Sequence, residues 1–166
     1  KFDLRLYVVV TSFAPLRAFL YENGLARFAN LPYTSAAQSL DSAATHLTNV
    51  SLNKRHKEFV KNASAADDGV GSVWSVRAMR VRLAAMGLDV GAIFAAIERV
   101  IVAALSAVEP AIAPHVAGHP FLPCFELFGF DVILDADAKP WLLEVNSFPS
   151  VSCGTPMDLD IKSRLV

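Results

Sequence analysis

Two strand-like runs near the C-terminus constrain the fold more than any other part of the sequence. Residues 125–134 and 140–145 are rich in Phe, Val, Leu and Ile, and these residue types favour strands. The segment 135–139 between them, DADAK, is short and polar, which is typical of a hairpin turn. The sequence therefore predicts two adjacent antiparallel strands in this region.

Acidic side chains interrupt both runs. Asp131 lies within the first, Glu144 lies within the second, and Asn146 follows two residues later. Because side chains alternate along a strand, Glu144 and Asn146 share one face, and a short hairpin brings them toward Asp131. Two carboxylates and a carboxamide are hard oxygen ligands of the kind that Mg²⁺ uses when it bridges nucleotide phosphates. The pattern predicts a magnesium–nucleotide site.

Other interpretations of these residues stay open. Asp131 and Glu144 could each pair with a neighbouring Arg or Lys, which is the common fate of a buried acid. They could also be the acid and base of a glycosidase, but no sugar-stacking aromatic residues accompany them. His46 next to Thr48 favours a turn or ligand-binding role, because threonine needs special activation to act as a nucleophile.

The first thirty residues predict three short strands. The runs 4–11 and 16–21 flank Ala14-Pro15, and Asn23-Gly24 is a strong turn signal before a third run at 25–30. Residues in such a meander would pair in sequence order. We expect an N-terminal antiparallel sheet.

Loops and helices follow. The tracts 34–45 and 54–72 are polar or rich in Ser and Ala, as in loops. Residues 75–86 have apolar side chains at helical spacing, with Arg77, Arg80 and Arg82 on the outer face. Residues 89–108 predict a mostly buried helix that ends at Glu109-Pro110.

Composition limits the possible partners. A hydrophobic content of 54% in 166 residues supports one globular domain, and a net charge of −1 argues against a chain-wide surface for nucleic acid. Cys124 and Cys153 have no metal-ligand spacing, which favours plain thiols in a reducing, cytosolic setting. No apolar tract reaches the ~18 residues that suggest a membrane span, so no membrane partner is expected.

Five motifs of the sequence point to a known family. They are KFDLRLYVVVTS at residues 1–12, LYENGLARFA at 20–29, HLTN at 46–49, FELFGFDVILD at 125–135 and KPWLLEVN at 139–146. These motifs resemble the tubulin tyrosine ligase-like family, whose members have an ATP-grasp fold and join amino acids to protein carboxylates. The tail PSVSCGTPMDLDIK at residues 149–162 is most similar to the glutamylase branch. The resemblance spans essentially the whole chain and implies a mixed α/β, mainly antiparallel ATP-grasp-like fold.

The resemblance also implies roles for single residues. Arg5 matches a position that lines the phosphate and acceptor region, and Arg5 and Glu144 are expected to take part in catalysis. Arg27 and Lys162 match positions that hold the incoming glutamate in glutamylases. The positions that match ATP contacts are Lys1, Asp3, Thr48 and Asn49, and those that match magnesium ligands are Asp131, Glu144 and Asn146.

The implied reaction is ATP-dependent. ATP phosphorylates a glutamate side chain of a tubulin tail, and the amine of free glutamate attacks the acyl phosphate to form an isopeptide bond. The resemblance implies tubulin and microtubules as partners, and a cytoplasmic, cytoskeletal location that can include the cilium or basal body. It further implies that residues 1–166 are the C-terminal portion of a catalytic domain, inactive without the upstream half.

The sequence departs from the family pattern at three places. Glutamylases usually read HLTNYS, have a basic residue just before the tryptophan that matches Trp74, and have Ser-Pro-Ser after the Glu-Val-Asn segment. At these places the chain has Val50, Val73 and Phe148. A valine cannot pair with a carboxylate or donate a hydrogen bond. The alternatives are therefore a catalytically inactive relative that only binds microtubules, or a ligase of the same family that adds glycine or tyrosine.

Overall fold

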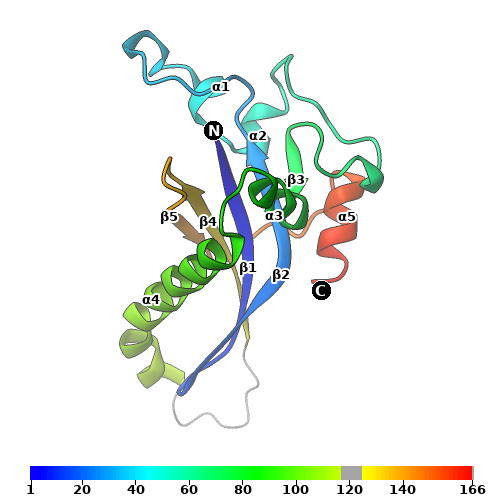
Figure 1. Ribbon diagram of the computed structural model, residues 1–166. Coiled ribbons are helices and arrows are strands. Elements are labelled where there is room, and N and C mark those ends of the chain that lie inside the picture. Colours follow the sequence, from blue (N-terminus) through cyan, green and yellow to red (C-terminus); the bar gives the residue numbers. More distant parts are fainter. Residues whose placement is uncertain (117–124, 166) are drawn as a thin grey trace.

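A five-stranded antiparallel sheet forms the centre of the molecule (Figure 1). The computed structural model describes residues 1–116 and 125–165, without the side chains of Gln38 and Ala65. The strand order is β3-β2-β1-β4-β5. The strands are β1 Phe2–Phe13, β2 Leu16–Phe28, β3 Val73–Ser75, β4 Glu126–Leu134 and β5 Pro140–Asn146. The predicted mixed α/β architecture with a mainly antiparallel sheet is confirmed.

Helices and short helical turns flank the sheet. The two longer helices, α3 and α4, lie in front of the strands in Figure 1. The helical elements are η1 Ala37–Ser39, α1 Ala43–His46, α2 Val50–Asn53, η2 Ala65–Asp67, α3 Val76–Ala85, α4 Val90–Val116 and α5 Pro156–Lys162. The tracts predicted as loops contain only α1, the two 3₁₀ turns and short connections.

The predicted turn at Asn23-Gly24 is wrong, because β2 is one continuous strand through this point. The pairing of β1 with β2 instead shifts register between Leu6 and Val8. The buried Asn23 side chain accepts a hydrogen bond from the Arg77 backbone N–H at 3.3 Å, which ties it to α3. A Cβ at Gly24 would clash with the Arg5 carbonyl oxygen, so the glycine permits a close strand contact and not a turn.

The helix predicted at 75–86 is confirmed as α3. The Ser75 hydroxyl accepts a hydrogen bond from the Ala78 backbone N–H at 2.9 Å and caps the first turn. Gly87, with φ of 81°, follows the last turn in the left-handed conformation that favours glycine. Both ends of this helix could be predicted because each depends on its immediate neighbours in the sequence.

The end predicted for the next helix is wrong. α4 continues through Pro110 and Pro114 to Val116. Both prolines are exposed, so the helix carbonyls that lose their N–H partners can be hydrated. The helix is also less buried than expected: Ile93, Phe94, Ile97, Ile101 and Leu105 form a single buried stripe.

The expectation that no apolar tract is long enough to span a membrane is wrong for α4. It is the one helix within residues 1–116 and 125–165 that is long and apolar enough to cross a membrane, with a mean hydropathy of 1.9 over 18 residues. Core helices of soluble proteins pass the same test, so length and composition are weak evidence. The buried stripe of α4 packs against the sheet, as in a core helix.

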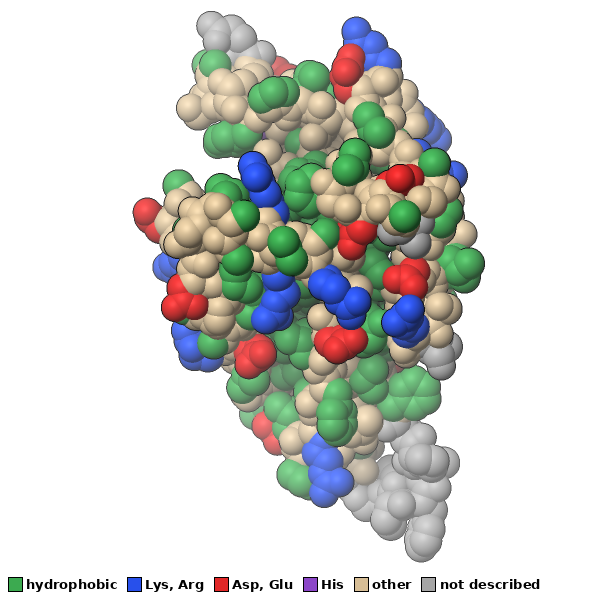
Figure 2. Space-filling model, turned by 45° about the vertical axis from the view of Figure 1, so that its right-hand side comes forward, with side chains coloured by type: hydrophobic (Ala, Val, Ile, Leu, Met, Phe, Trp, Pro, Cys, Tyr) green, Lys and Arg blue, Asp and Glu red, His purple; other side chains and the backbone are tan. Residues whose placement is uncertain are grey.

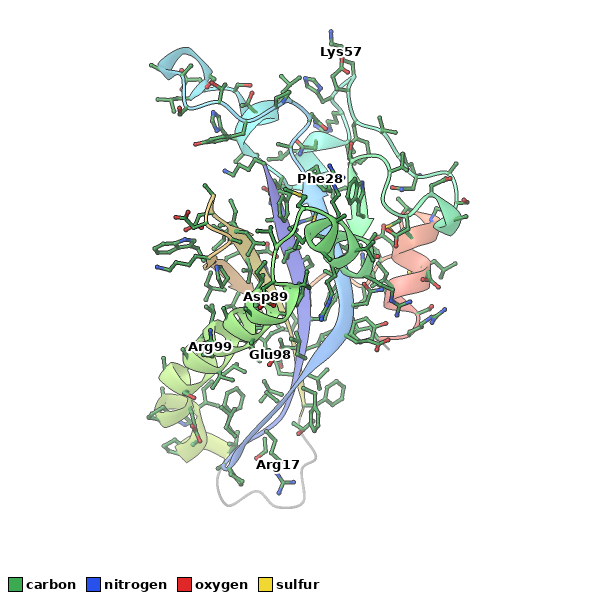
Figure 3. All side chains as sticks on the ribbon, viewed as in Figure 1. Arg17, Phe28, Lys57, Asp89, Glu98 and Arg99 are labelled. Atoms are coloured by element: carbon green, nitrogen blue, oxygen red, sulfur yellow. The ribbon has the colours of Figure 1, made fainter. Side chains whose placement is uncertain are left out.

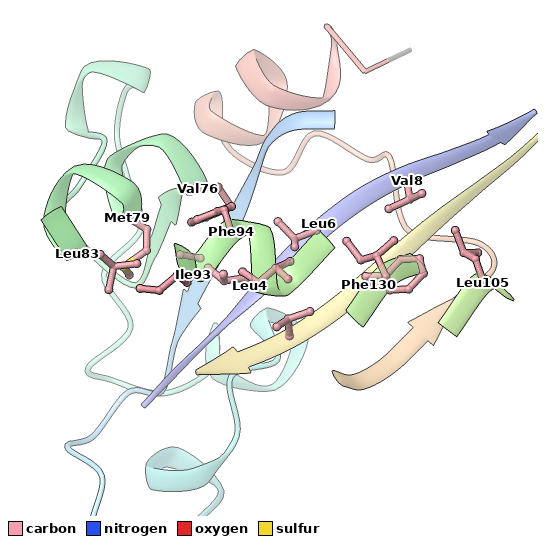
Figure 4. Packing of buried hydrophobic residues seen from close by; sticks show 14 of the residues in the cluster. Leu4, Leu6, Val8, Val76, Met79, Leu83, Ile93, Phe94, Leu105 and Phe130 are labelled. Atoms are coloured by element: carbon pink, nitrogen blue, oxygen red, sulfur yellow. The ribbon is translucent and has the colours of Figure 1, made fainter. Parts of the chain in front are cut away.

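The two faces of the sheet differ in character. Side chains of the even-numbered residues 4–10 on β1 pack with Phe130 and Val132 of β4 against α3 and α4 (Figure 4). The odd-numbered residues Asp3, Arg5 and Tyr7 therefore point to the opposite face. A small second cluster of Leu25, Met157 and Ile161 attaches α5.

Cys153 is an exposed free thiol, as expected. Cys124 lies outside the described residues.

Candidate nucleotide and metal site

A cleft of about 300 Å³ opens where the N-terminus, the segment after α1 and the β4–β5 hairpin meet. Its lining includes acidic, basic and amide side chains from three separate parts of the sequence. The lining residues are Lys1, Asp3, His46, Leu47, Thr48, Asn49, Asp131, Ile133, Leu143 and Glu144. All four predicted ATP-contacting residues and two of the three predicted magnesium ligands thus lie in one cleft.

The pairing of β4 with β5 positions the acidic side chains. Asp131 lies directly opposite Glu144, and Gly129 lies opposite Asn146, so both β5 side chains share a face with Asp131. The Asn146 Nδ2 donates a hydrogen bond to the Glu144 Oε1 at 3.1 Å. The predicted convergence of the three side chains on one face is confirmed; their role as metal ligands stays a prediction.

An ion-pair network fills the sheet face beside the cleft. The Arg5 Nε and Nη2 donate to the two oxygens of Asp131 at 2.5 and 2.9 Å. Arg27 bonds both oxygens of Asp3 and also lies 2.8 Å from the Asp131 Oδ2. Arg27 thereby bridges one predicted nucleotide contact and one predicted metal ligand. The open alternative that Asp131 pairs with arginines is confirmed, whereas the described residues place no cation within ion-pair distance of Glu144.

The network sets the charge state of its members. Burial alone would raise the pKa of Asp131, but the hydrogen bond from Arg5 and the charge of Arg27 outweigh it and lower that pKa. Burial alone would lower the pKa of Arg27, but Asp3 and Asp131 raise it. Asp131 thus stays a carboxylate at neutral pH although it is only 2% exposed.

Tyr7 is a neighbour of this network that sequence reasoning missed. It is 1% exposed, and burial raises its pKa to about 12. The charges of Arg5, Asp158, Arg27 and Asp131 act on it as well. Alternation along residues 3–7 was the available signal, because it places Tyr7 on the face of Asp3 and Arg5.

The segment that carries Thr48 and Asn49 is attached to the sheet by hydrogen bonds. The Asn53 side chain, 3% exposed, donates to the Leu47 carbonyl oxygen at 2.9 Å and to the Phe28 carbonyl oxygen at 3.2 Å. The His46 ring also lines the cleft and meets the Tyr33 ring edge-on. These contacts hold a loop of the chain against the end of β2.

Two predicted substrate residues lie outside the cleft. Arg27 is bound by Asp3 and Asp131, as described above. The Lys162 Nζ on α5 lies 2.9 Å from the Asp158 carboxylate and donates to the Ser152 carbonyl oxygen at 2.8 Å. Both residues are 7% exposed, and their proposed contact with glutamate stays a prediction.

The cleft offers an oxygen-only donor set for a metal. Across the described ranges, no group of three or more His, Cys, Asp or Glu is placed to hold an ion, so any metal depends on two carboxylates and the Asn146 amide. Among the described residues, the Asp131 Oδ1 accepts from Arg5 alone, which leaves a lone pair on this oxygen. Such a set fits Mg²⁺, which is held by one or two carboxylates together with phosphate oxygens and water.

The outer face of α3 is less available than the sequence suggested. Arg77 lies 3.4 Å from the Glu22 carboxylate, and the Arg80 guanidinium stacks 4.1 Å from the centre of the Phe94 ring. In Figure 2, basic and acidic side chains lie next to one another over the middle of that view. This arrangement resembles an ordinary charged surface.

Comparison with known proteins identifies the family. The model of the family described as "Tubulin-tyrosine ligase family" matches residues 1–166. The chain belongs to this family. Its resemblance to the family is therefore confirmed, and its mixed α/β, antiparallel architecture agrees with the ATP-grasp-like fold that the family implied.

The relatives found are named as tubulin glutamylases. The chain is 44% identical to the human tubulin polyglutamylase TTLL5 over all of its length and 13% of that protein. It is 44% identical to the tubulin polyglutamylase ttll-5 of Caenorhabditis elegans, of which it covers 23%. Identity to the tubulin monoglutamylase TTLL4 of Mus musculus is 40%, over 14% of that protein. The chain thus spans less than a quarter of the length of these relatives.

The structure places the three departures from the family pattern outside the lining of the cleft. Val50 begins α2 directly after Asn49, and Val73 on β3 lies opposite Arg27. Phe148 is 90% exposed after β5. None of them lines the cleft.

Proposed function

We propose that this chain is part of the catalytic domain of an ATP-dependent ligase that adds glutamate to glutamate side chains of tubulin through an isopeptide bond. One observation carries the proposal: Lys1, Asp3, Thr48 and Asn49 share a cleft with Asp131 and Glu144. Six residues chosen for nucleotide or metal contact thus lie together although they are far apart in the sequence. The names of the relatives support glutamate as the amino acid and tubulin as the acceptor.

The charges of the cleft suit a magnesium–nucleotide complex. Asp131, Glu144 and Asn146 would hold Mg²⁺, which neutralises phosphate charge when it is bound. Lys1 and Asp3 line the same cleft, where an ammonium can contact phosphate oxygens. Arg5 stands behind Asp131 and keeps that carboxylate oriented and ionised.

The proposed reaction has two steps. The acceptor carboxylate attacks the terminal phosphorus of ATP, which forms an acyl phosphate and releases ADP. The amine of free glutamate then attacks the acyl carbon, and phosphate leaves as the amide forms. The protein contributes orientation and charge stabilisation, so it needs no covalent nucleophile.

Substitution of Glu144 tests the site. In the full reading frame that contains this chain, we expect Glu144→Gln to lower ATP-dependent incorporation of labelled glutamate into tubulin about 100-fold, because a metal ligand is lost. Glu98→Gln is the matched control, since Glu98 is an exposed acid on α4 (Figure 3). A Glu144→Gln protein that works at the normal rate would refute the metal-ligand assignment.

The amino acid needs its own test. Glutamate, glycine and tyrosine are supplied separately, and tubulin tails are analysed by mass spectrometry. We expect incorporation of glutamate only. Incorporation of glycine or tyrosine alone would exclude the glutamylase assignment, and no incorporation of any amino acid, with microtubule binding retained, would favour the inactive relative.

We also propose that residues 1–166 supply only part of the nucleotide site. The small share of each relative that the chain covers supports this. The 166-residue chain is compared with the full reading frame for ATP binding by calorimetry. We expect the chain alone to bind ATP at least about tenfold more weakly; equal affinity would refute the proposal.

A further inference from the structure

We propose that residues 54–61, the basic segment, form a docking surface for the acidic residues that flank the target glutamate of the acceptor peptide. This inference rests on the proposed function, because it assigns the acceptor side of the same cleft. The segment reads KRHKEFVK and has a net charge of +3, while the whole chain has −1. Its four cations, Lys54, Arg55, Lys57 and Lys61, are all exposed.

These cations are less compensated than others in the molecule. Arg27 and Lys162 are buried in ion pairs, Arg5 is partly buried in another, and Arg80 stacks on an aromatic ring. In the part of the chain that the structure describes, the segment has one ion pair, between Lys57 and Glu58 at 4.0 Å. Uncompensated exposed charge costs little in water and remains available to a partner of opposite charge.

Nearby acids are engaged elsewhere. The Asp67 carboxylate accepts hydrogen bonds from the backbone N–H groups of Ala63 and Ser64 at 3.0 and 2.8 Å. The Asp68 carboxylate accepts from the backbone N–H and hydroxyl of Ser75. These acids hold their own loop in shape and do not reach the basic segment as ion-pair partners.

The basic segment is anchored at both ends. At its start, Asn53 is bonded to the carbonyl oxygens of Leu47 and Phe28, as described above. At its end, Val60 and Ser72 exchange hydrogen bonds of 2.9 and 3.0 Å, and the buried Asn62 side chain donates to the Asp67 and Val70 carbonyl oxygens. The charges are therefore presented on a fixed base, which lowers the entropy cost of binding.

The segment lies one short helix away from the cleft. Thr48 and Asn49 line the cleft, α2 begins at Val50, and Lys54 follows its last residue. A helix of this length spans about 6 Å, and an extended peptide advances about 3.4 Å per residue. A peptide with its target side chain in the cleft can therefore place residues two or more positions away over the basic segment.

The proposed reaction itself favours such a surface. Each addition consumes one acceptor carboxylate and one ammonium, and it leaves the two carboxylates of the added glutamate. The acceptor therefore gains one negative charge per cycle. A basic surface beside the cleft would bind the modified acceptor more tightly than the unmodified one, whereas a net charge of −1 for the chain argues against a nucleic acid.

The test measures binding without catalysis. A fluorescent deca-glutamate peptide is titrated with the full-length protein by anisotropy, with deca-glutamine as the neutral probe. The triple variant Lys54→Gln, Arg55→Gln, Lys57→Gln is compared with a control of equal charge change, Arg17→Gln, Arg82→Gln, Arg99→Gln. Figure 3 shows Lys57 and Arg17 at opposite ends of the molecule.

We expect the triple variant to weaken deca-glutamate binding about tenfold at low salt, and the control to change it less than about twofold. The difference in deca-glutamate affinity between the two variants should disappear at high salt. Neither variant should bind deca-glutamine well. Equal losses in both variants, no loss in the triple variant, or tighter binding of a single-stranded oligonucleotide through the same three residues would overturn the inference.

The result separates the two proposals. Loss of peptide binding in the triple variant of a protein that ligates no amino acid would support the docking surface and refute the proposed function. Normal glutamate ligation in a triple variant that binds the peptide like the control would refute the docking surface alone.

Discussion

The two faces of the central sheet use the same strands for opposite purposes. On β1, the even-numbered residues 4–10 are at most 2% exposed and belong to the apolar core cluster. Of the odd-numbered residues, Asp3 and Tyr7 are almost as buried and Arg5 is partly buried, but together they carry two charges and a hydroxyl. One face gains stability from apolar burial, and the other must compensate every charge that it removes from water.

The difference between the two faces indicates which one can carry a functional site. Replacing a buried ion network with apolar residues is often neutral or stabilising, so such a network is weak evidence for stability. The network of Asp3, Arg5, Arg27 and Asp131 directly adjoins the cleft, which is consistent with retention for chemistry.

The largest effect is expected on the apolar face. Phe130→Ala removes a side chain that is 0% exposed and leaves a cavity between β4 and α4. We expect it to lower the free energy of unfolding by about 3–5 kcal/mol in urea denaturation. Phe19→Ala, at a position 62% exposed on β2, should cost less than about 1 kcal/mol. Equal losses would show that the apolar face is not the core.

The next effect is expected on the polar face. Asp131→Asn leaves Arg5 and Arg27 with an uncharged partner, and we expect a loss of about 3 kcal/mol by the same measurement. Asp137→Asn in the exposed hairpin should be near neutral. A neutral Asp131→Asn would mean that the network contributes nothing to folding.

The free energies of unfolding of wild type and Asp131→Asn should also depend differently on pH. The folded pKa of Asp131 lies below its ordinary value of 3.8. Its contribution is therefore complete above that pH and is lost as the pH falls through the folded pKa. The gap in stability between wild type and Asp131→Asn should narrow below about pH 4. A gap that widens in acid would contradict the lowered pKa.

A smaller effect is expected in alkali. Burial raises the pKa of Tyr7 from 10.0 to about 12, so the unfolded chain loses this proton before the folded one does. The contribution of Tyr7 to the free energy of unfolding should be constant below pH 10 and fall by about 2 kcal/mol as the pH rises toward 12. Tyr7→Phe should remove the alkaline loss of stability that is due to Tyr7. The loss due to Tyr21, whose pKa burial also raises, should remain. Identical alkaline melting curves for wild type and Tyr7→Phe would refute the assignment.

The smallest effect on stability is expected at Glu144. Its side chain is exposed, so Glu144→Gln should change the free energy of unfolding by less than about 0.5 kcal/mol. The same substitution is expected to abolish most ligase activity. A loss of stability as large as that of Asp131→Asn would assign Glu144 to the structural network and not to the cleft.

Local pattern in the sequence predicted much of this molecule. The hairpin of β4 and β5, the helix capped by Ser75 and the shared face of Asp131, Glu144 and Asn146 all follow from alternation, helical spacing or capping. Each depends on residues within about one turn or one hairpin of one another. The same local rules failed at Asn23-Gly24 and at Pro110, where contacts with α3 or solvent exposure override the usual turn or breaker signal.

Only the tertiary structure brought Arg27 to Asp131 and Thr48 to the cleft of Asp131 and Glu144. Arg5 and Asp131 are 126 residues apart and meet because β4 pairs with β1 rather than with β2. Strand order depends on which apolar faces α3 and α4 cover together, and no single segment encodes that choice. The sequence by itself determined which side chains could hold a metal and a nucleotide; long-range contacts decided that arginines hold Asp131 and that Lys1, Asp3, Thr48, Asn49 and Glu144 line one cleft with it.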